Sequence, residues 1–319
     1  MTTLANKGGR RSVALMEDSQ REAVLAYCKI AAASGALLTL KDLADLLAID
    51  ATEKELEDTI SSDKYLASRV CVESGRVLLR QPGFDLEIAR KATEEAERRR
   101  KRAIANVEAA RTFAPLLGKD AVFVAVAGTS SYLSASEGDD IDYYVITKTN
   151  RMWAFLLKSF ILSRISSLAR RTGPPFCFSF VMDERQSREE LSSPKGALYA
   201  RDTLTAKVIS GGAAYHSILE NASWMRSYFP SVYEKRLGEG GSSGGQHPSR
   251  KNGSRILNML LFLTLGRYVL LRAWILNRQL AEAGRSAAIF ETKLGPGKLE
   301  YASRRYVELG KMYQAMEKS

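Results

Sequence analysis

The chain has 319 residues, of which 45% are hydrophobic, and a formal net charge of +11. This length predicts two or three domains, and the hydrophobic share is enough to form a sizeable core. The positive charge suits a phosphate-rich partner or substrate, although it equally serves solubility. The only two histidines, His216 and His247, lie far apart, which argues against a histidine-based catalytic triad or metal cluster.

Cysteine usage and the first residues of the chain bear on its compartment. Cys28, Cys71 and Cys177 are widely spaced, stand in apolar runs and do not follow a zinc-binding spacing. A few thiols of this kind are typical of a reducing compartment. The first residues also lack the apolar segment of a secretion signal. We therefore predict a cytoplasmic protein.

A first domain is predicted over residues 18–82, after a flexible N-terminus over residues 1–17. Its pattern is three helices followed by two short strands around a Glu-Ser-Gly turn. Thr39 and Thr52 each precede a helical pattern and have an acidic residue three positions later, which predicts a helix start at both. Three helices followed by a hairpin are the order of elements in a winged-helix domain.

The charge of the third predicted helix bears on what such a domain would bind. Winged helices usually contact DNA through this helix, yet residues 53–58 carry four acidic side chains against the single cation of Lys54. DNA phosphates would repel it. A role in protein interaction or packing is therefore favoured over nucleic-acid binding, which would depend on Arg76 and Arg80 in the hairpin.

Residues 83–113 are predicted to form a connecting helix with an arginine-rich stretch at residues 98–102. Contact with phosphate or RNA is one interpretation of that stretch. Consecutive residues point around a helix, however, and Glu94, Glu95 and Glu97 can pair with these cations at i, i+4 spacing. A solvated helix face is therefore the favoured interpretation.

The clearest chemical pattern is a pair of acids, Asp140 and Asp142, next to the strand-like sequence YYVIT. Side chains alternate along a strand, so both carboxylates face the same side. Two such groups repel each other unless a cation lies between them. A hard divalent ion that takes oxygen ligands, Mg²⁺ or Mn²⁺, is the expected cofactor.

A glycine and two hydroxyl residues precede these acids. The apolar run VFVAVA leads to Gly128, where the lack of a side chain lets a phosphate approach the backbone. Thr129, Ser130 and the free N–H groups of a following helix are the predicted phosphate ligands. The alternative is a polar loop that merely joins two core strands.

Together these features resemble the signature of the DNA polymerase β-type nucleotidyltransferase superfamily, in which an apolar strand, a glycine with a hydroxyl residue and an acid-x-acid pair follow one another. Gly128, Thr129, Asp140 and Asp142 occupy its positions, with Thr where Ser is usual. The resemblance implies an α/β (α+β) nucleotidyltransferase core with a mixed sheet over residues 114–236. It also implies Mg-dependent transfer of a nucleoside monophosphate from an NTP to an unknown hydroxyl acceptor, with both acids as catalytic metal ligands.

Members of this superfamily usually carry a third carboxylate on the adjacent strand, which is predicted here in the run FCFSFVMDE, residues 176–184. The site-facing position in that run is Ser179. Asp183 has the right parity but would lie about 13 Å further along an extended strand. The third acid is therefore missing or displaced, which favours an alternative: a catalytically degenerate nucleotidyltransferase fold that acts as a nucleotide-binding or protein-interaction regulator.

A second resemblance covers roughly residues 70–235. A little-characterised group of prokaryotic nucleotidyltransferase-domain proteins joins a winged-helix-like front, an arginine-rich helix, the core and a helical tail. The residues that match an element of this tail are Asn221, Trp224, Tyr228, Phe229 and Pro230. The resemblance implies the fold and the superfamily but no substrate.

The remaining sequence is predicted to be a flexible linker, residues 237–255, and C-terminal helices, residues 256–319. The first of these helices is the most apolar stretch of the chain. Arg267 and Arg272 interrupt it, and each would cost roughly 2.5 kcal/mol or more at a bilayer centre. Burial against the core or a protein partner is therefore favoured, with association at a membrane surface as the alternative.

Overall fold

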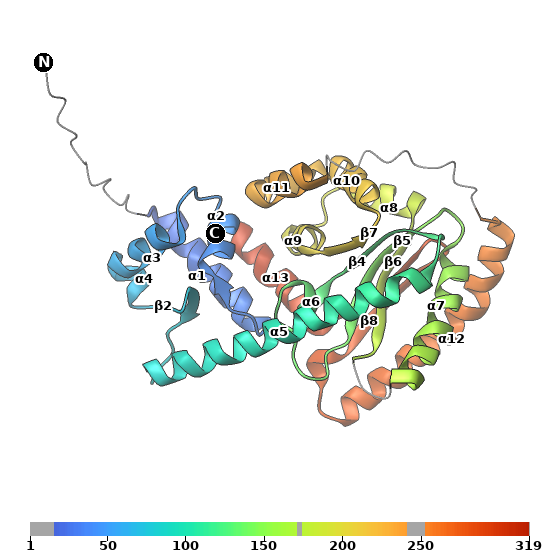
Figure 1. The fold of residues 1–319 in the computed structure, drawn as a ribbon, viewed down its shortest axis with the longest axis horizontal. Helices are drawn as coiled ribbons and strands as arrows, with labels where there is room; N and C mark the ends of the chain where they lie inside the picture. Colours follow the sequence, from blue (N-terminus) through green and yellow to red (C-terminus); the bar gives the residue numbers. More distant parts are fainter. Residues whose placement is uncertain (1–15, 171–173, 241–252, 319) are drawn as a thin grey trace, which may run out of the picture.

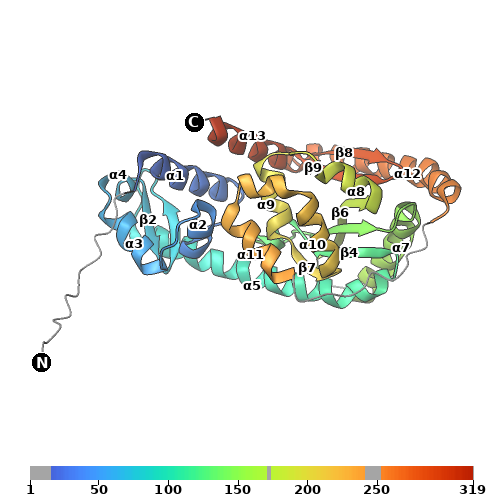
Figure 2. The same cartoon turned by 90° about the horizontal axis from the view of Figure 1, so that it is seen from above.

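The structure is a computed structural model that describes residues 16–170, 174–240 and 253–318. It has 13 α-helices in this described part, together with two separate β-sheets. Figures 1 and 2 show the N-terminal helices at one end of an elongated molecule and a helix-covered sheet at the other.

The N-terminal region is a small helical domain with a three-stranded sheet. Its elements are α1 (Asp18–Ala33), β1 (Leu38–Thr39), α2 (Leu40–Leu47), α3 (Glu53–Ser62), α4 (Lys64–Ala67), β2 (Val70–Glu73) and β3 (Arg76–Leu79). β3 pairs antiparallel with both β1 and β2. Thr39 and Thr52 cap α2 and α3 through their side chains, so both predicted helix starts are confirmed. β1 was not predicted, because two residues carry no readable period.

A single long helix, α5 (Leu86–Leu117), connects this region to the rest of the chain (Figure 1). It begins after Asp85, whose carboxylate accepts a hydrogen bond from a backbone N–H of the first turn. Arg98 and Arg99 both pair with Glu95, at 2.8 and 3.0 Å. These pairs agree in part with the interpretation of the arginine-rich stretch as a solvated helix face. Arg99 and Arg102 depart from it, because they are half-buried and donate to the carbonyls of Gly35 at 2.6 Å and of Ala135 at 3.2 Å.

A six-stranded mixed sheet forms the centre of the larger region, in the order β7-β4-β5-β6-β9-β8. The strands are β4 (Ala121–Val126), β5 (Ile141–Thr147), β6 (Phe176–Asp183), β7 (Lys207–Ser210), β8 (Phe290–Gly295) and β9 (Lys298–Ser303). Only β5 and β6 run parallel, and the other neighbouring pairs are antiparallel. The chain therefore has the mixed α and β class that the sequence predicts.

Helices cover both faces of this sheet, because its strands send apolar side chains alternately to each side. In β4, Phe123 and Ala125 belong to one hydrophobic core, and Val124 and Val126 belong to the other. The first core is covered by α8 (Glu184–Leu191), α9 (Ala197–Thr205), α10 (Gly212–Asn221), the 3-10 helix η1 (Ser223–Ser227), α11 (Pro230–Gly240) and α13 (Arg304–Lys318). The second is covered by α5, α7 (Met152–Arg170) and α12 (Arg255–Glu282).

The prediction of helices alone over residues 256–319 is wrong between residues 290 and 303. This segment forms the hairpin β8–β9, preceded by the 3-10 helix η2 (Ser286–Ala288), and β9 pairs with β6. Leu299 of β9 is fully buried in the core of the sheet. The backbone groups at the edge of β6 find their partners in β9, and no local sequence pattern reveals this pairing. The predicted linker overlaps α11, which continues to Gly240, and its residues 241–252 lie outside the described part of the chain.

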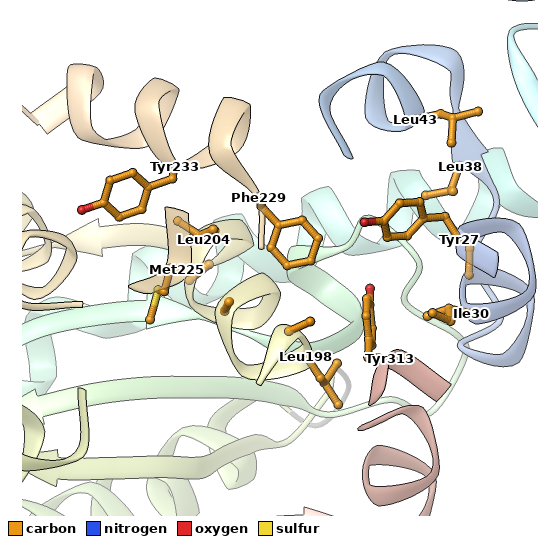
Figure 3. Close-up of a cluster of buried hydrophobic side chains, with 14 of the residues drawn as sticks. Tyr27, Ile30, Leu38, Leu43, Leu198, Leu204, Met225, Phe229, Tyr233 and Tyr313 are labelled. Atoms are coloured by element: carbon orange, nitrogen blue, oxygen red, sulfur yellow. The ribbon is translucent and has the colours of Figure 1, made fainter. Parts of the chain in front are cut away.

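The N-terminal region packs against the larger region through a continuous hydrophobic core. Figure 3 shows Tyr27 and Ile30 of α1 facing Tyr313 of α13, with Phe229 at the start of α11 close by. Tyr313 is 1% exposed, and its ring meets that of Phe229 edge to face with the ring centroids 6.4 Å apart. Residues from the two ends of the chain thus share one core with the middle of it.

Candidate active site

The turn after β4 brings a glycine against one of the two acids. Gly128 has a φ of +63°, in the left-handed region, and a Cβ added to it would lie 2.6 Å from Asp142 Oδ2. The backbone N–H of Ala127 donates to the carbonyl of Asp142 at 2.9 Å, which holds the two segments together. Any side chain at position 128 would displace the Asp142 carboxylate. Glycine is therefore needed here for the approach of this carboxylate, besides the predicted approach of a phosphate.

Asp140 and Asp142 lie together with Cys177 of β6. One ligand atom of each residue lies within 4.8 Å of the others. The parallel pairing of β5 with β6 places Asp142 directly opposite Cys177, so the thiol reaches both carboxylates. The apolar run around Cys177 gives no local sign of a place at the acid pair. The parity of Cys177 with Ser179 along the strand is the one signal that could have placed it here.

Burial and like charge make this cluster costly in the absence of a cation. Loss of hydration, followed by repulsion from Asp140, raises the pKa of Asp142 well above its usual value. Loss of hydration also raises the pKa of Asp140, although a hydrogen bond with the Cys177 thiol opposes that shift. Burial next to the two carboxylates raises the pKa of the Cys177 thiol well above its usual value. A divalent ion between the carboxylates would remove most of this repulsion.

The two hydroxyl residues after Gly128 take different positions from those predicted for phosphate ligands. The Thr129 hydroxyl donates to Asp139 Oδ2 at 2.9 Å, and the same oxygen accepts from a backbone N–H at 2.8 Å. Ser130 is 1% exposed, and its hydroxyl accepts a hydrogen bond from Asn106 of α5 at 3.1 Å. Gly128 and Thr129 line the cavity at the site, whereas Ser130 points into the core and anchors the turn on α5.

Of the two candidate positions for a third carboxylate, Ser179 lies at the site and Asp183 does not. The Ser179 hydroxyl hydrogen-bonds to the Asp142 carboxylate, so it belongs to the site. Asp183 lies at the opposite end of β6, where it pairs with Thr147 and caps α8. Its carboxylate accepts from the N–H groups of Gln186, at 2.9 Å, and of Asn150, at 3.2 Å. Asp183 is therefore wrong as a third acid, because its parity is right but its distance along the strand is too great.

A cavity of about 1430 Å³ extends from the acid pair. β9 pairs with β6 only over residues 180–182 of β6, and the first half of β6 and the last half of β9 both line this cavity. Lys298 of β9 also lines it and lies 3.2 Å from Glu190 and 2.9 Å from Glu300. The C-terminal segment therefore forms a wall of the site, which no motif in the sequence indicates.

The donor atoms of the acid cluster suit the expected metal in part. The carboxylates of Asp140 and Asp142 are oxygen ligands of the kind that Mg²⁺ and Mn²⁺ take. The Cys177 sulfur is a soft ligand that Mg²⁺ does not favour, so the two carboxylates are the residues that would hold such an ion. Comparisons with protein-family models, curated proteins and solved structures found no match to this chain.

Another acid, the half-buried Asp202 of α9, lines the same cavity. Loss of hydration raises the pKa of its carboxyl to about 7, although a hydrogen bond from the Tyr306 hydroxyl of α13 opposes the shift. The folded protein therefore holds a proton that the unfolded chain releases near pH 4. Because of this, Asp202 costs stability that grows as the pH rises from about 4 to about 7.

We expect Asp202→Asn to flatten this part of the pH profile. Between pH 4 and pH 7, Asp202 should lower the free energy of unfolding of the wild-type protein by at most about 4 kcal/mol. Asp202→Asn should remove this contribution and keep the contribution of Asp140 and Asp142, whose pKa values are also raised. Chemical denaturation at both ends of the window measures it. Asp50→Asn, at an exposed position, is the matched control. Equal pH dependence in wild type and Asp202→Asn would contradict the assignment.

Proposed function

We propose that this protein is a metal-dependent nucleotidyltransferase of the DNA polymerase β type. It would transfer a nucleoside monophosphate from an NTP to a hydroxyl acceptor. The observation that carries the proposal is the contact between the Gly128 turn and the Asp142 carboxylate, with Asp140 alongside. This arrangement joins a backbone that a phosphate can approach to two half-buried acids that repel each other without a cation.

The residues of the site have distinct roles in such a reaction. Asp140 and Asp142 would hold a divalent ion, which supplies positive charge to the triphosphate when bound. Gly128 leaves room for the Asp142 carboxylate and for a phosphate at the backbone. Thr129 fixes the loop before the acids through its bond to Asp139. The acceptor oxygen bonds to the α-phosphorus, the bond to the β-phosphate oxygen breaks, and pyrophosphate leaves while the hydroxyl proton passes to solvent.

The same geometry also favours an alternative, a catalytically degenerate domain that binds nucleotide or protein partners. Cys177 and Ser179 stand where superfamily members usually carry a carboxylate. A thiol whose pKa is raised, or a serine hydroxyl, is a poor base for an acceptor hydroxyl. Binding without transfer is the behaviour that this alternative predicts.

The N-terminal region supports a winged-helix interpretation with a role in protein contacts. Helices α1, α2 and α3 precede the hairpin β2–β3 as expected, with β1 and the short helix α4 as additions that were not predicted. The cations of the hairpin are already engaged: Arg76 lies 3.0 Å from Glu97, and the Arg80 side chain donates to the carbonyl of Val70 at 3.1 Å. With the acidic face of α3 exposed, we propose packing or protein interaction here and not DNA binding.

Calorimetric titration with each NTP, with and without Mg²⁺ or Mn²⁺, tests the proposal. We expect metal-dependent binding of at least one nucleotide, followed by transfer of its labelled α-phosphate to an acceptor. Asp140→Asn/Asp142→Asn should lose both. Glu137→Gln, an exposed position in the same loop, should keep both. Binding without transfer supports the nucleotide-binding form of the degenerate alternative. Absence of binding to every nucleotide contradicts the transferase and leaves only the protein-interaction form of that alternative.

A further inference from the structure

The apolar helix α12 lies beside α7 on the outer side of the larger region (Figure 1). Among the described residues, α12 is the one helix long and apolar enough to cross a membrane by length and composition. Its most apolar window has a mean hydropathy of 1.6, and only 17% of that window is buried. We expected this helix to be buried against the core or a partner. In the structure one face of the helix packs against the core, and the opposite face is exposed.

The exposed face of the two helices is rich in large apolar side chains. On α12 these side chains are between 39% and 75% exposed, and they are Ile256, Leu257, Leu260, Leu263, Tyr268, Leu270, Leu271, Trp274 and Leu276. On α7 they are Leu157, Ile161 and Ile165. We call these residues the α7–α12 face. Tyr268 and Leu276 also line the cavity at the acid pair. An exposed group of large apolar side chains of this kind marks an interaction site.

The charges on the same helices are almost all positive. α7 contains no acidic residue, and the only one in α12 is Glu282, in its last position. Arg164, Arg267 and Arg272 are exposed and form no ion pair with a carboxylate in the described part of the chain. Arg267 lies within the apolar stripe of α12, four residues from Leu263 and four from Leu271, whereas Arg164 and Arg272 also line the cavity at the acid pair. An exposed apolar helix face that carries unpaired cations is the pattern of a helix that lies at an anionic lipid surface.

Two asparagines, one buried and one half-buried, hold α12 along the protein. Near its start, Asn258 accepts from the N–H of Trp153 at 3.1 Å and donates to the carbonyl of Pro296 at 2.8 Å. Near its end, Asn277 exchanges two hydrogen bonds with the backbone of Phe290, at 2.7 and 3.0 Å. A helix anchored at both ends to the sheet can lie in the plane of a membrane interface, whereas spanning the bilayer would break these contacts.

We propose that the α7–α12 face binds the surface of a membrane that contains anionic lipids. The lipid acyl region would take the exposed leucines and Trp274, and the headgroups would take the arginines, whose long side chains reach outward from an apolar face. A second copy of the chain fits less well, because pairing this face with itself would bring Arg267 and Arg272 against like charges. Charge complementarity therefore selects the anionic bilayer.

Vesicle co-sedimentation of the full chain tests this proposal. We expect the protein to pellet with vesicles of phosphatidylcholine mixed with phosphatidylglycerol, and far less with pure phosphatidylcholine or in high salt. Arg267→Glu/Arg272→Glu should weaken binding at least about 25-fold, since each cation near the surface contributes about a fivefold effect. Lys54→Glu/Lys64→Glu makes the same charge change at exposed positions of the N-terminal region and should bind like the wild type.

Three further measurements distinguish a membrane surface from a spanning helix and from a second copy of the chain. Trp274 is 60% exposed, so its fluorescence should shift to the blue on vesicle binding, and Trp274→Phe should abolish that shift. Alkaline carbonate should strip the protein from the vesicles. Failure to bind anionic vesicles would overturn the proposal and show no lipid contact. Resistance to carbonate would overturn it in favour of a helix that spans the bilayer. A dimer that Leu260→Asn/Leu271→Asn dissociates would overturn it in favour of an interface between two copies of the chain.

Discussion

Asp142→Asn is expected to lower nucleotidyl transfer by about a thousandfold while it raises the stability of the metal-free protein. The loss of activity follows from the loss of a metal ligand, because an ion at this place contributes several kcal/mol of charge stabilisation. The gain in stability follows from burial: loss of hydration and repulsion from Asp140 already raise the pKa of this carboxyl. A neutral amide of the same shape avoids that cost, which we expect to be on the order of 1–3 kcal/mol.

Lower activity together with higher stability would show that the Asp142 carboxylate serves function at a cost in stability and does not support the fold. Transfer assays with labelled NTP give the first effect, and chemical denaturation in a chelator gives the second. Mn²⁺ should stabilise the wild-type protein and leave Asp142→Asn unchanged, since only the former binds the ion. Glu137→Gln removes an exposed charge from the same loop and should change neither quantity. A destabilised Asp142→Asn would show that the carboxylate is part of the folded scaffold.

The local parts of the site could be predicted from the sequence, because their signals lie within one strand-turn-strand unit. The apolar run before Gly128 and the alternation around Asp140 and Asp142 each follow from the period of a strand. The structure places the glycine and both acids together as expected. Helix caps at Thr39 and Thr52 were predictable for the same reason, since a capping box is complete within four residues.

The non-local parts could not be predicted in this way. Ser130 turns away from the cavity because Asn106, on a helix earlier in the chain, takes its hydroxyl. Cys177 enters the site through the register of β5 with β6, which a sequence alone leaves open. Lys298 reaches the cavity because a hairpin late in the chain pairs with β6. Each of these placements depends on a contact between segments far apart in sequence.

The C-terminal helix α13 is an essential part of the fold, and Tyr313→Ala is expected to lower the free energy of unfolding by about 3–5 kcal/mol. Tyr313 is 1% exposed and packs between α1 and the helices over the sheet (Figure 3). Its hydroxyl accepts a hydrogen bond from Arg201 of α9 at 2.6 Å. Truncation to alanine leaves a cavity in the shared core and also removes the acceptor of the Arg201 guanidinium.

Tyr313→Phe separates these two contributions, because it keeps the ring and removes only the hydroxyl; it should cost about 1–3 kcal/mol. Denaturation curves measure both variants, and hydrogen exchange locates the effect. Because Tyr313 joins α1 to the larger region, Tyr313→Ala should speed exchange in α1 more than in β4. Uniform acceleration in both elements would instead mean that the two regions unfold as one unit, and a variant as stable as the wild type would contradict the packing itself.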